Sequence, residues 1–184
     1  PLTRMKLQIS LMKDENAKSE LEVDVIEMTS MLDSYVSFVK TESPEPIETI
    51  IINELIGDIV KTVEKNGAEL TIKEKNTIQT SGRQIQLKRA FNNIIDNSQR
   101  YAKKIEIILY TNEKDCVIEF NDDGEGIPRD KYEDVFKPFF TLDPSRNKLK
   151  GESGLGLTIT RDIIRSHGGD VKSVSYTHLT LPTS

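Results

Sequence analysis

Two asparagines and an arginine are spaced so that a single helix would present them together. The segment 84–102 has helical periodicity, and Asn93, Asn97 and Arg100 project from it about 100° away from its apolar stripe. Hard oxygen ligands such as carboxamides suit Mg²⁺, and Mg²⁺ in proteins usually accompanies phosphates. Considered alone, these residues are more often a solvated polar face, because asparagine is common on helix surfaces.

A glycine-rich turn directly follows a predicted strand, and its sequence is Asp122-Asp123-Gly124-Glu125-Gly126-Ile127-Pro128. Glycines at alternate positions let a ligand approach the backbone closely. The carboxylate of Asp122, at the strand end, can accept a hydrogen bond from an amino group such as that of adenine. By itself the turn is more often an ordinary loop, because Asp-Gly is a common turn dipeptide.

A second glycine-rich turn, over residues 151–157, runs into a predicted helix. The free N–H groups and the positive dipole end of a helix N-terminus favour an anion. The turn lacks the Gly-Lys-Ser/Thr ending of a P-loop. It also falls late in the chain, with no strand immediately before it, which excludes a dinucleotide-binding fingerprint. Alone it is a weak signal for any one ligand.

The elements that must position these clusters alternate between helix and strand. The apolar periodicity predicts helices over 52–65, 84–102 and 155–166, and strands over 68–75, 105–110 and 116–121. The link 111–115 between the last two strands suits a hairpin. Asn66-Gly67 is expected to end the first helix, and His167-Gly168-Gly169 the last.

Residues 1–41 are predicted to form a hairpin of two helices, with the polar stretch Lys13–Glu20 as its turn. Apolar residues on the second helix recur at alternating spacings of four and three, as in a coiled-coil seam: Leu21, Val25, Met28, Leu32, Tyr35 and Val39. So small a hairpin buries too little surface to be stable alone. We therefore expect it to dimerise into a four-helix bundle; the alternative is packing on the rest of its own chain.

Composition bounds what the chain can be. It has 184 residues, a net charge of -5 and a single cysteine, Cys116. One cysteine excludes an internal disulfide and a cysteine-based zinc site. No apolar run is long enough to span a membrane, and the acidity argues against nucleic acid as a partner. Pro44 and Pro46 mark a linker over 42–46, because closely spaced prolines cannot sit inside a helix.

The clusters together resemble the ATP-binding domain of two-component sensor histidine kinases, in the wider GHKL group with gyrase, Hsp90 and MutL. The matching boxes are Leu87–Ala102 (N box), Asp122–Ile127 (first glycine box), Val135–Phe140 (F box) and Gly151–Leu157 (second glycine box). Within the family the sequence is most similar to the EnvZ-like osmosensor group. The resemblance implies an α+β fold: a two-layer α/β sandwich of the Bergerat type over 47–174, preceded by an all-α helical hairpin.

The resemblance implies a catalytic group of Asn93, Asn97 and Arg100. Asn97 would be the Mg²⁺ ligand, Asn93 a second ligand on the phosphate side, and Arg100 a phosphate contact. At the other end of the nucleotide, Tyr101 would stack near the adenine and Asp122 would accept its amino hydrogen bond.

The glycine and F boxes are implied to shape the rest of an ATP site. Gly124 and Gly126 would make room for the base, with Ile127 beside them. Gly154, Leu155 and Gly156 would form the phosphate end of a lid, which Phe136, Phe139 and Phe140 would anchor. Arg146 would contact the γ-phosphate; the alternative is plain surface charge.

The family's activity is transfer of the ATP γ-phosphate to a histidine and then to a response-regulator aspartate. The implied cofactors are ATP and Mg²⁺, and the implied partners are a second copy of the hairpin and an OmpR-like response regulator. The chain would be the cytoplasmic portion of a protein of the bacterial inner membrane. The alternatives are a non-catalytic nucleotide-binding scaffold, or an ATPase switch, which Asn93 disfavours because that group has a catalytic glutamate there.

Two departures from the family pattern carry further expectations. The phosphoacceptor histidine would lie five residues before Pro1, so the chain is expected to be a fragment that cannot autophosphorylate, since His167 and His178 do not replace it. Residues 175–184 look like a non-family tail, typical of translated adapter sequence, in place of the family's last strand. We therefore expect an incomplete sheet edge.

Overall fold

The computed structural model describes residues 2–40, 45–63, 69–112, 115–142, 154–173 and 177–182. The chain divides into two compact units. The first comprises Pro1–Ser43 with Pro138–Leu155, and the second comprises Pro44–Lys137 with Gly156–Ser184. No helix in the described residues is both long and apolar enough to cross a membrane.

The first unit contains a helical hairpin of α1 (Leu2–Ser10) and α2 (Glu15–Lys40), which contact each other. Two helices were predicted, but the turn is shorter than the stretch 13–20. Helix α2 begins at Glu15 because the Asp14 carboxylate accepts hydrogen bonds from the N–H groups of Asn16 (3.0 Å) and Ala17 (3.2 Å). An aspartate in this position caps a helix and starts it early.

The second unit contains a five-stranded sheet, whose strand order is β2-β4-β5-β7-β6. Its strands are β2 (Glu69–Glu74), β4 (Lys104–Thr111), β5 (Asp115–Asp122), β6 (Asp170–Ser173) and β7 (Thr177–Pro182). Among the described strands of this sheet, β2 and β4 pair in parallel and the other pairs are antiparallel. A separate antiparallel ribbon joins β1 (Glu48–Ile51) to β3 (Gln79–Gly82).

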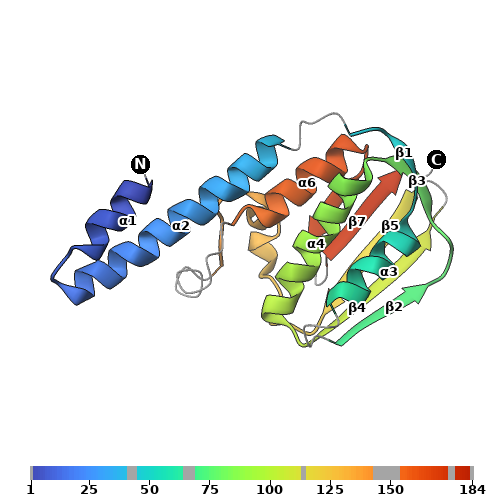
Figure 1. Cartoon of the computed structure of the whole chain (residues 1–184). Coiled ribbons are helices and arrows are strands. Elements are labelled where there is room, and N and C mark those ends of the chain that lie inside the picture. The colour runs from blue at the N-terminus through green and yellow to red at the C-terminus, as the bar shows by residue number, and fades with distance from the viewer. Residues whose placement is uncertain are drawn as a thin grey trace. The chain divides into compact units, whose positions relative to one another are not determined.

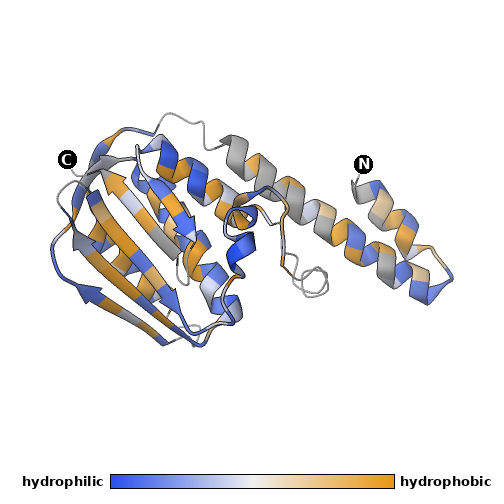
Figure 2. Ribbon diagram, turned by 180° about the vertical axis from the view of Figure 1, so that it is seen from behind, coloured by the Kyte–Doolittle hydropathy of each residue, from blue (hydrophilic) through white to orange (hydrophobic). Residues whose placement is uncertain are grey.

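Three helices cover one face of this sheet: α3 (Ile52–Val63), α4 (Gln84–Tyr101) and α6 (Gly156–Ser166) (Figure 1). Alternate residues of β4, Ile105, Ile107 and Leu109, are buried in the core, and Phe120 of β5 meets Phe91 of α4 there. Seen from behind, the strands of the sheet carry both hydrophobic and hydrophilic residues (Figure 2). The predicted α+β, two-layer fold is therefore confirmed.

Most predicted elements form within a few residues of their expected bounds. Helices 52–65, 84–102 and 155–166 become α3, α4 and α6. The hairpin across 111–115 is confirmed, because Thr111 pairs with Cys116 where β4 meets β5. The predicted Asn66-Gly67 helix end lies outside the described residues. The ribbon of β1 and β3 was not predicted.

The expectation of a missing last strand is wrong. Residues 177–182 form β7, which pairs with β5 on one side and with β6 on the other. Leu179 and Leu181 are completely or almost completely buried. Alternate leucines in a short segment are the period that a strand needs to send side chains into a core, and the sequence showed that period.

Gly169 provides a test of β7, because a Cβ at this position would overlap the carbonyl oxygen of Thr180. Because the obstacle is the Thr180 backbone, which cannot swing away as the end of a flexible side chain can, we expect Gly169→Ala to lower the free energy of unfolding by about 1–3 kcal/mol. Gly57 in α3 is the matched control, since nothing lies within 4 Å of a Cβ there. We expect Gly57→Ala to raise that free energy by about 0.5–1 kcal/mol. Urea unfolding measures both, and a Gly169 variant as stable as the parent would contradict the position of β7.

Candidate functional site

Helix α4 positions the predicted asparagine cluster. Its apolar stripe, which includes Leu87, Phe91 and Ile95, is completely buried, whereas Asn93 and Asn97 are half-buried and Arg100 is exposed. The three polar residues therefore lie on the flank of the helix, as their spacing predicts.

A hydrogen bond joins the asparagine cluster to the second glycine turn. The Asn93 side-chain Nδ2 donates to the carbonyl oxygen of Gly156 at 3.2 Å. The buried Thr160 hydroxyl strengthens the same seam, because its Oγ1 lies 2.9 Å from the Gly156 oxygen and 3.3 Å from the Ala90 oxygen. The start of α6 is thus fixed beside the middle of α4. Sequence reasoning did not predict a role for Thr160.

The Asp122 carboxylate is held from two sides at the end of β5. The Ser98 hydroxyl donates to its Oδ2 (3.0 Å), and the Gly124 N–H donates to its Oδ1 (3.1 Å). Ser98 was assigned only to the apolar stripe of α4, and its place on that stripe is what aims it at the strand end. A carboxylate offers about four acceptor positions, so two bonds leave capacity for a ligand.

Gly124 and Gly126 are glycines for different reasons. A Cβ at position 124 would lie 2.9 Å from Asp122 Oδ1 and 3.1 Å from the carbonyl oxygen of Tyr101, so the turn packs closely on the end of α4. Gly126 has open space around it but a φ of 74°, which side chains disfavour. The need for glycine at both positions therefore follows from the packing and backbone conformation of the chain itself. Ile127 beside them is half-buried, and the Tyr101 side chain is 45% exposed.

Asp123 fastens the same corner of the domain. Its Oδ1 accepts hydrogen bonds from the backbone N–H groups of Lys104 (2.9 Å) and Lys103 (2.8 Å). These bonds stabilise the charged carboxylate, and they lower the pKa of Asp123 below its usual range. The chain is therefore fixed where α4 gives way to β4. The sequence shows two consecutive aspartates at this corner, but sequence analysis assigned a role only to Asp122 and not to Asp123.

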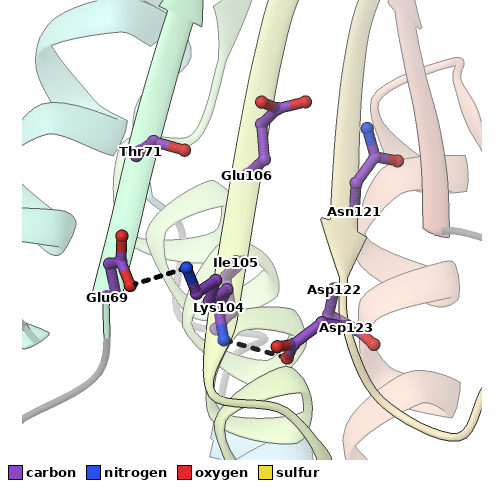
Figure 3. Close-up of a pocket in the computed structure, with 8 residues that line it drawn as sticks. All are labelled: Glu69, Thr71, Lys104, Ile105, Glu106, Asn121, Asp122 and Asp123. Carbon is purple, nitrogen blue, oxygen red and sulfur yellow. Dashed lines mark hydrogen bonds and ion pairs between the residues drawn. The ribbon is translucent and has the colours of Figure 1, made fainter.

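A shallow cavity of about 270 Å³ opens beside this corner, lined by Glu69, Thr71, Lys104, Ile105, Glu106, Asn121, Asp122 and Asp123. Figure 3 shows Lys104 between two acidic neighbours: its Nζ pairs with Glu69 at 3.4 Å, and its backbone nitrogen donates to Asp123. Asp122 is the only predicted site residue among those that line the cavity. The cavity therefore adjoins the predicted adenine end and does not extend to the asparagines of α4.

The F box is anchored on α6. Phe136 is buried at the end of η3 (Asp134–Phe136), and the Thr158 hydroxyl donates to its carbonyl oxygen at 3.0 Å. The Arg161 guanidinium stacks over the Phe136 ring, 4.5 Å from its centroid. Arg161 also pairs with Glu133 (2.8 Å) and Asp170 (3.4 Å). The bond from Arg161 lowers the pKa of Glu133. None of these partners was predicted.

Gly154, within the second glycine turn, belongs to the first unit. The Phe139 N–H donates to the Gly154 carbonyl oxygen at 3.0 Å, and Gly154 has a φ of 60°. A Cβ there would lie 2.9 Å from the Phe139 backbone, so this close approach requires glycine. Leu155 is buried. Arg146, the predicted γ-phosphate contact, lies outside the described residues.

Comparison with known families gives a match over residues 82–183 to the family described as "Histidine kinase-, DNA gyrase B-, and HSP90-like ATPase". The match includes β7. The sensor histidine kinase GtrS of Pseudomonas aeruginosa is 30% identical over 173 residues, which cover 93% of this chain and 35% of GtrS. The sensor histidine kinase CpxA of Escherichia coli is 28% identical over 185 residues, covering 94% of this chain and 40% of CpxA.

Solved structures share the fold. The mycobacterial sensor histidine kinase MprB superposes with a TM-score of 0.66 at 24% identity, covering 75% of this chain and 98% of that one. The Acinetobacter baumannii histidine kinase AdeS gives a TM-score of 0.64 at 18% identity, covering 100% of this chain and 92% of that one.

The two-layer sandwich, with a glycine turn at each of two places beside the asparagine-bearing helix α4, defines a GHKL-type ATP-binding domain. This chain belongs to the histidine kinase-, DNA gyrase B- and HSP90-like ATPase family, and within it carries the ATP-binding part of a two-component sensor histidine kinase. It spans about 35–40% of the length of the two relatives described above.

Arg161 offers a test of the F-box anchor. We expect Arg161→Met to lower the free energy of unfolding by about 1–3 kcal/mol, because the Arg161 side chain is only 14% exposed and would lose both its stacking on Phe136 and its bonds to Glu133 and Asp170. Arg165→Met is the matched control: Arg165 also pairs with Asp170 but is 53% exposed, so its loss should change that free energy by at most about 0.5 kcal/mol. Urea unfolding at neutral pH measures both variants, and equal losses would contradict the anchor.

The loss of stability in Arg161→Met should depend on pH. Glu133 has a lowered pKa in the folded chain, so the stability it gains from Arg161 is present above the ordinary glutamate pKa of about 4.3. That stability is lost as the pH falls through the lowered value. The difference in stability between the parent and Arg161→Met should therefore narrow on acidification, and a difference that widens would contradict this assignment.

Proposed function

We propose that this chain binds ATP with Mg²⁺ beside α4 and is the catalytic part of a sensor kinase that passes the γ-phosphate to a histidine. The Asn93–Gly156 hydrogen bond is the observation that carries the proposal. It joins the helix that would hold the metal to the glycine turn that would meet the phosphates. Two motifs far apart in sequence would thus share one site.

At the adenine end, Asp122 would accept the amino group of the base. Support comes from Ser98 and Gly124, which hold the carboxylate in one orientation and leave it acceptor capacity. Tyr101, whose backbone carbonyl lies against Gly124 and whose side chain is 45% exposed, would stack near the base, and Gly126 and Ile127 would border it.

At the phosphate end, Asn97 and Asn93 would supply oxygen ligands to Mg²⁺. The bond to Gly156 uses the Nδ2 of Asn93 and not its oxygen, so that oxygen can serve as a metal ligand. No group of three His, Cys, Asp or Glu side chains in the described parts of the chain could hold a metal. A cation here would thus depend on carboxamide and phosphate oxygens, a donor set that suits Mg²⁺.

The protein's contribution to the transfer would be positioning and charge neutralisation, since phosphoryl transfer needs little covalent chemistry from the enzyme. Arg100 would contact the phosphates, as would Arg146. The N-terminus of α6, with Gly156 as its first residue, would add backbone N–H groups and a positive dipole end, and Gly154 and Leu155 precede it.

The hairpin would join two copies of the chain. Leu21, Met28 and Leu32 of the predicted seam are 40–47% exposed, and a second hairpin would cover them in a four-helix bundle. The side chains of Tyr35 and Val39 lie outside the described residues. The other partner would be an OmpR-like response regulator. The chain would act on the cytoplasmic side of the inner membrane, as part of a longer sensor.

Asn97→Ala tests the ATP site. We expect it to abolish Mg²⁺-dependent binding of a fluorescent ATP analogue and to leave the thermal unfolding temperature unchanged, because the side chain is half-buried and outside the core. Gln99→Ala, which removes another carboxamide from the same helix, should bind like the parent. A variant that binds the analogue as tightly as the parent would overturn the metal assignment.

A second experiment tests the kinase activity. His167 would not be the phosphoacceptor, because both of its ring nitrogens are engaged in hydrogen bonds. Its Nε2 accepts the Arg83 N–H (3.0 Å), and its Nδ1 bonds the Ile163 oxygen (2.7 Å). An extended chain with an H-box histidine ahead of Pro1 should form acid-labile phosphohistidine from labelled ATP. The same extended chain with glutamine in place of that histidine should form none. Nucleotide binding without phosphohistidine in the extended chain would favour the non-catalytic scaffold.

A further inference from the structure

The N-terminus of α4 is capped by Glu45, a residue near the start of the second unit. Arg83 at the N-cap position makes no side-chain capping bond, and the first turn of α4 holds no acidic residue. The Glu45 carboxylate takes over this role. Its Oε1 accepts the N–H of Ile85 at 2.6 Å and its Oε2 accepts the N–H of Gln86 at 3.3 Å.

Local structure explains why Glu45 reaches this helix. Strand β1 begins at Glu48, which pairs with Gly82 at the end of β3, directly before α4. The antiparallel register brings the residues that precede Glu48 alongside those that follow Gly82. Pro46 also restricts the backbone of Glu45 to extended conformations, so less freedom is lost when the carboxylate docks.

The bond between Glu45 and the start of α4 stabilises the helix in two ways. The first N–H groups of a helix have no partner within it, and a carboxylate satisfies them with charge-assisted bonds. Its negative charge also lies at the positive end of the helix dipole. The Arg83 N–H, one residue before the helix, is satisfied by His167. Glu45 and His167 thus provide partners for three of the four N–H groups that α4 leaves open.

Hydrogen bonds hold α4 along its length: from Ile85 to Glu45 at the start, from Asn93 to Gly156 in the middle, and from Ser98 to Asp122 near the end. A helix moves nearly as a rigid rod, so releasing one end tilts the side chains along it. The cap lies at the surface, since Ile85 is 72% exposed. It can therefore open without unfolding the core.

We propose that Glu45 is a positioning residue for the nucleotide site, acting through α4 on Asn93 and Asn97. The inference rests on the function proposed above. The cap, the Asn93–Gly156 bond and the Ser98–Asp122 bond all act on this one helix.

The test compares Glu45→Ala and Glu45→Gln with Glu48→Gln, which neutralises an exposed carboxylate three residues on. Amide hydrogen exchange at Ile85 and Gln86 should quicken in the Glu45 variants only. With Mg²⁺, well below the unfolding temperature, the fluorescent ATP analogue should bind about three- to tenfold more weakly to Glu45→Ala. Glu45→Gln, which keeps an oxygen acceptor, should lose about twofold, and the Glu48 variant nothing.

The outcomes separate the two proposals. Faster exchange at Ile85 and Gln86 with an unchanged dissociation constant would make the cap purely structural and overturn the inference. Unchanged exchange in both Glu45 variants would overturn it as well, by removing the cap itself. A parent chain that does not bind the analogue would instead overturn the proposed function. If Glu45→Ala does not fold, Glu45→Gln decides the question, because it retains the shape of the side chain.

Discussion

The burial of one face of α4 against the sheet is the constraint on which the rest of the domain depends. Phe91 of this helix meets Phe120 of β5 with ring centroids 6.4 Å apart, and both rings are fully buried. Turning the helix by a quarter would expose those rings and bury two carboxamides, which costs free energy unless each is hydrogen-bonded. Packing alone thus decides which way Asn93 and Asn97 face.

Packing leaves the tilt and the sliding of α4 less well determined, because apolar contacts are not directional. Polar contacts supply the direction. Ser98 fixes the helix to the end of β5, and Thr160 fixes it to the first turn of α6. Each contact joins an element of the candidate site to another, so the features that hold the fold also set the geometry of the site.

The C-terminal strand shows the same coupling at the far side of the sheet. Strand β7 lies between β5 and β6, and its buried Leu179 and Leu181 extend the core under α6. The helix that begins at Gly156 therefore rests on residues that sequence analysis had set apart as a tail. Their alternation was legible, but a short segment of unusual composition gave no sign of which strands it would pair with.

The sequence by itself determined the helices, the strands β2, β4 and β5, the flank of α4 and the glycine turns, since each follows from periodicity or backbone needs within a few residues. It did not determine which polar groups meet. Ser98 and Asp122 are 24 residues apart, Arg161 and Glu133 28, Glu45 and Ile85 40, and His167 and Arg83 84. Such pairs form only when the hydrophobic core brings distant segments together, so the tertiary structure alone decided them.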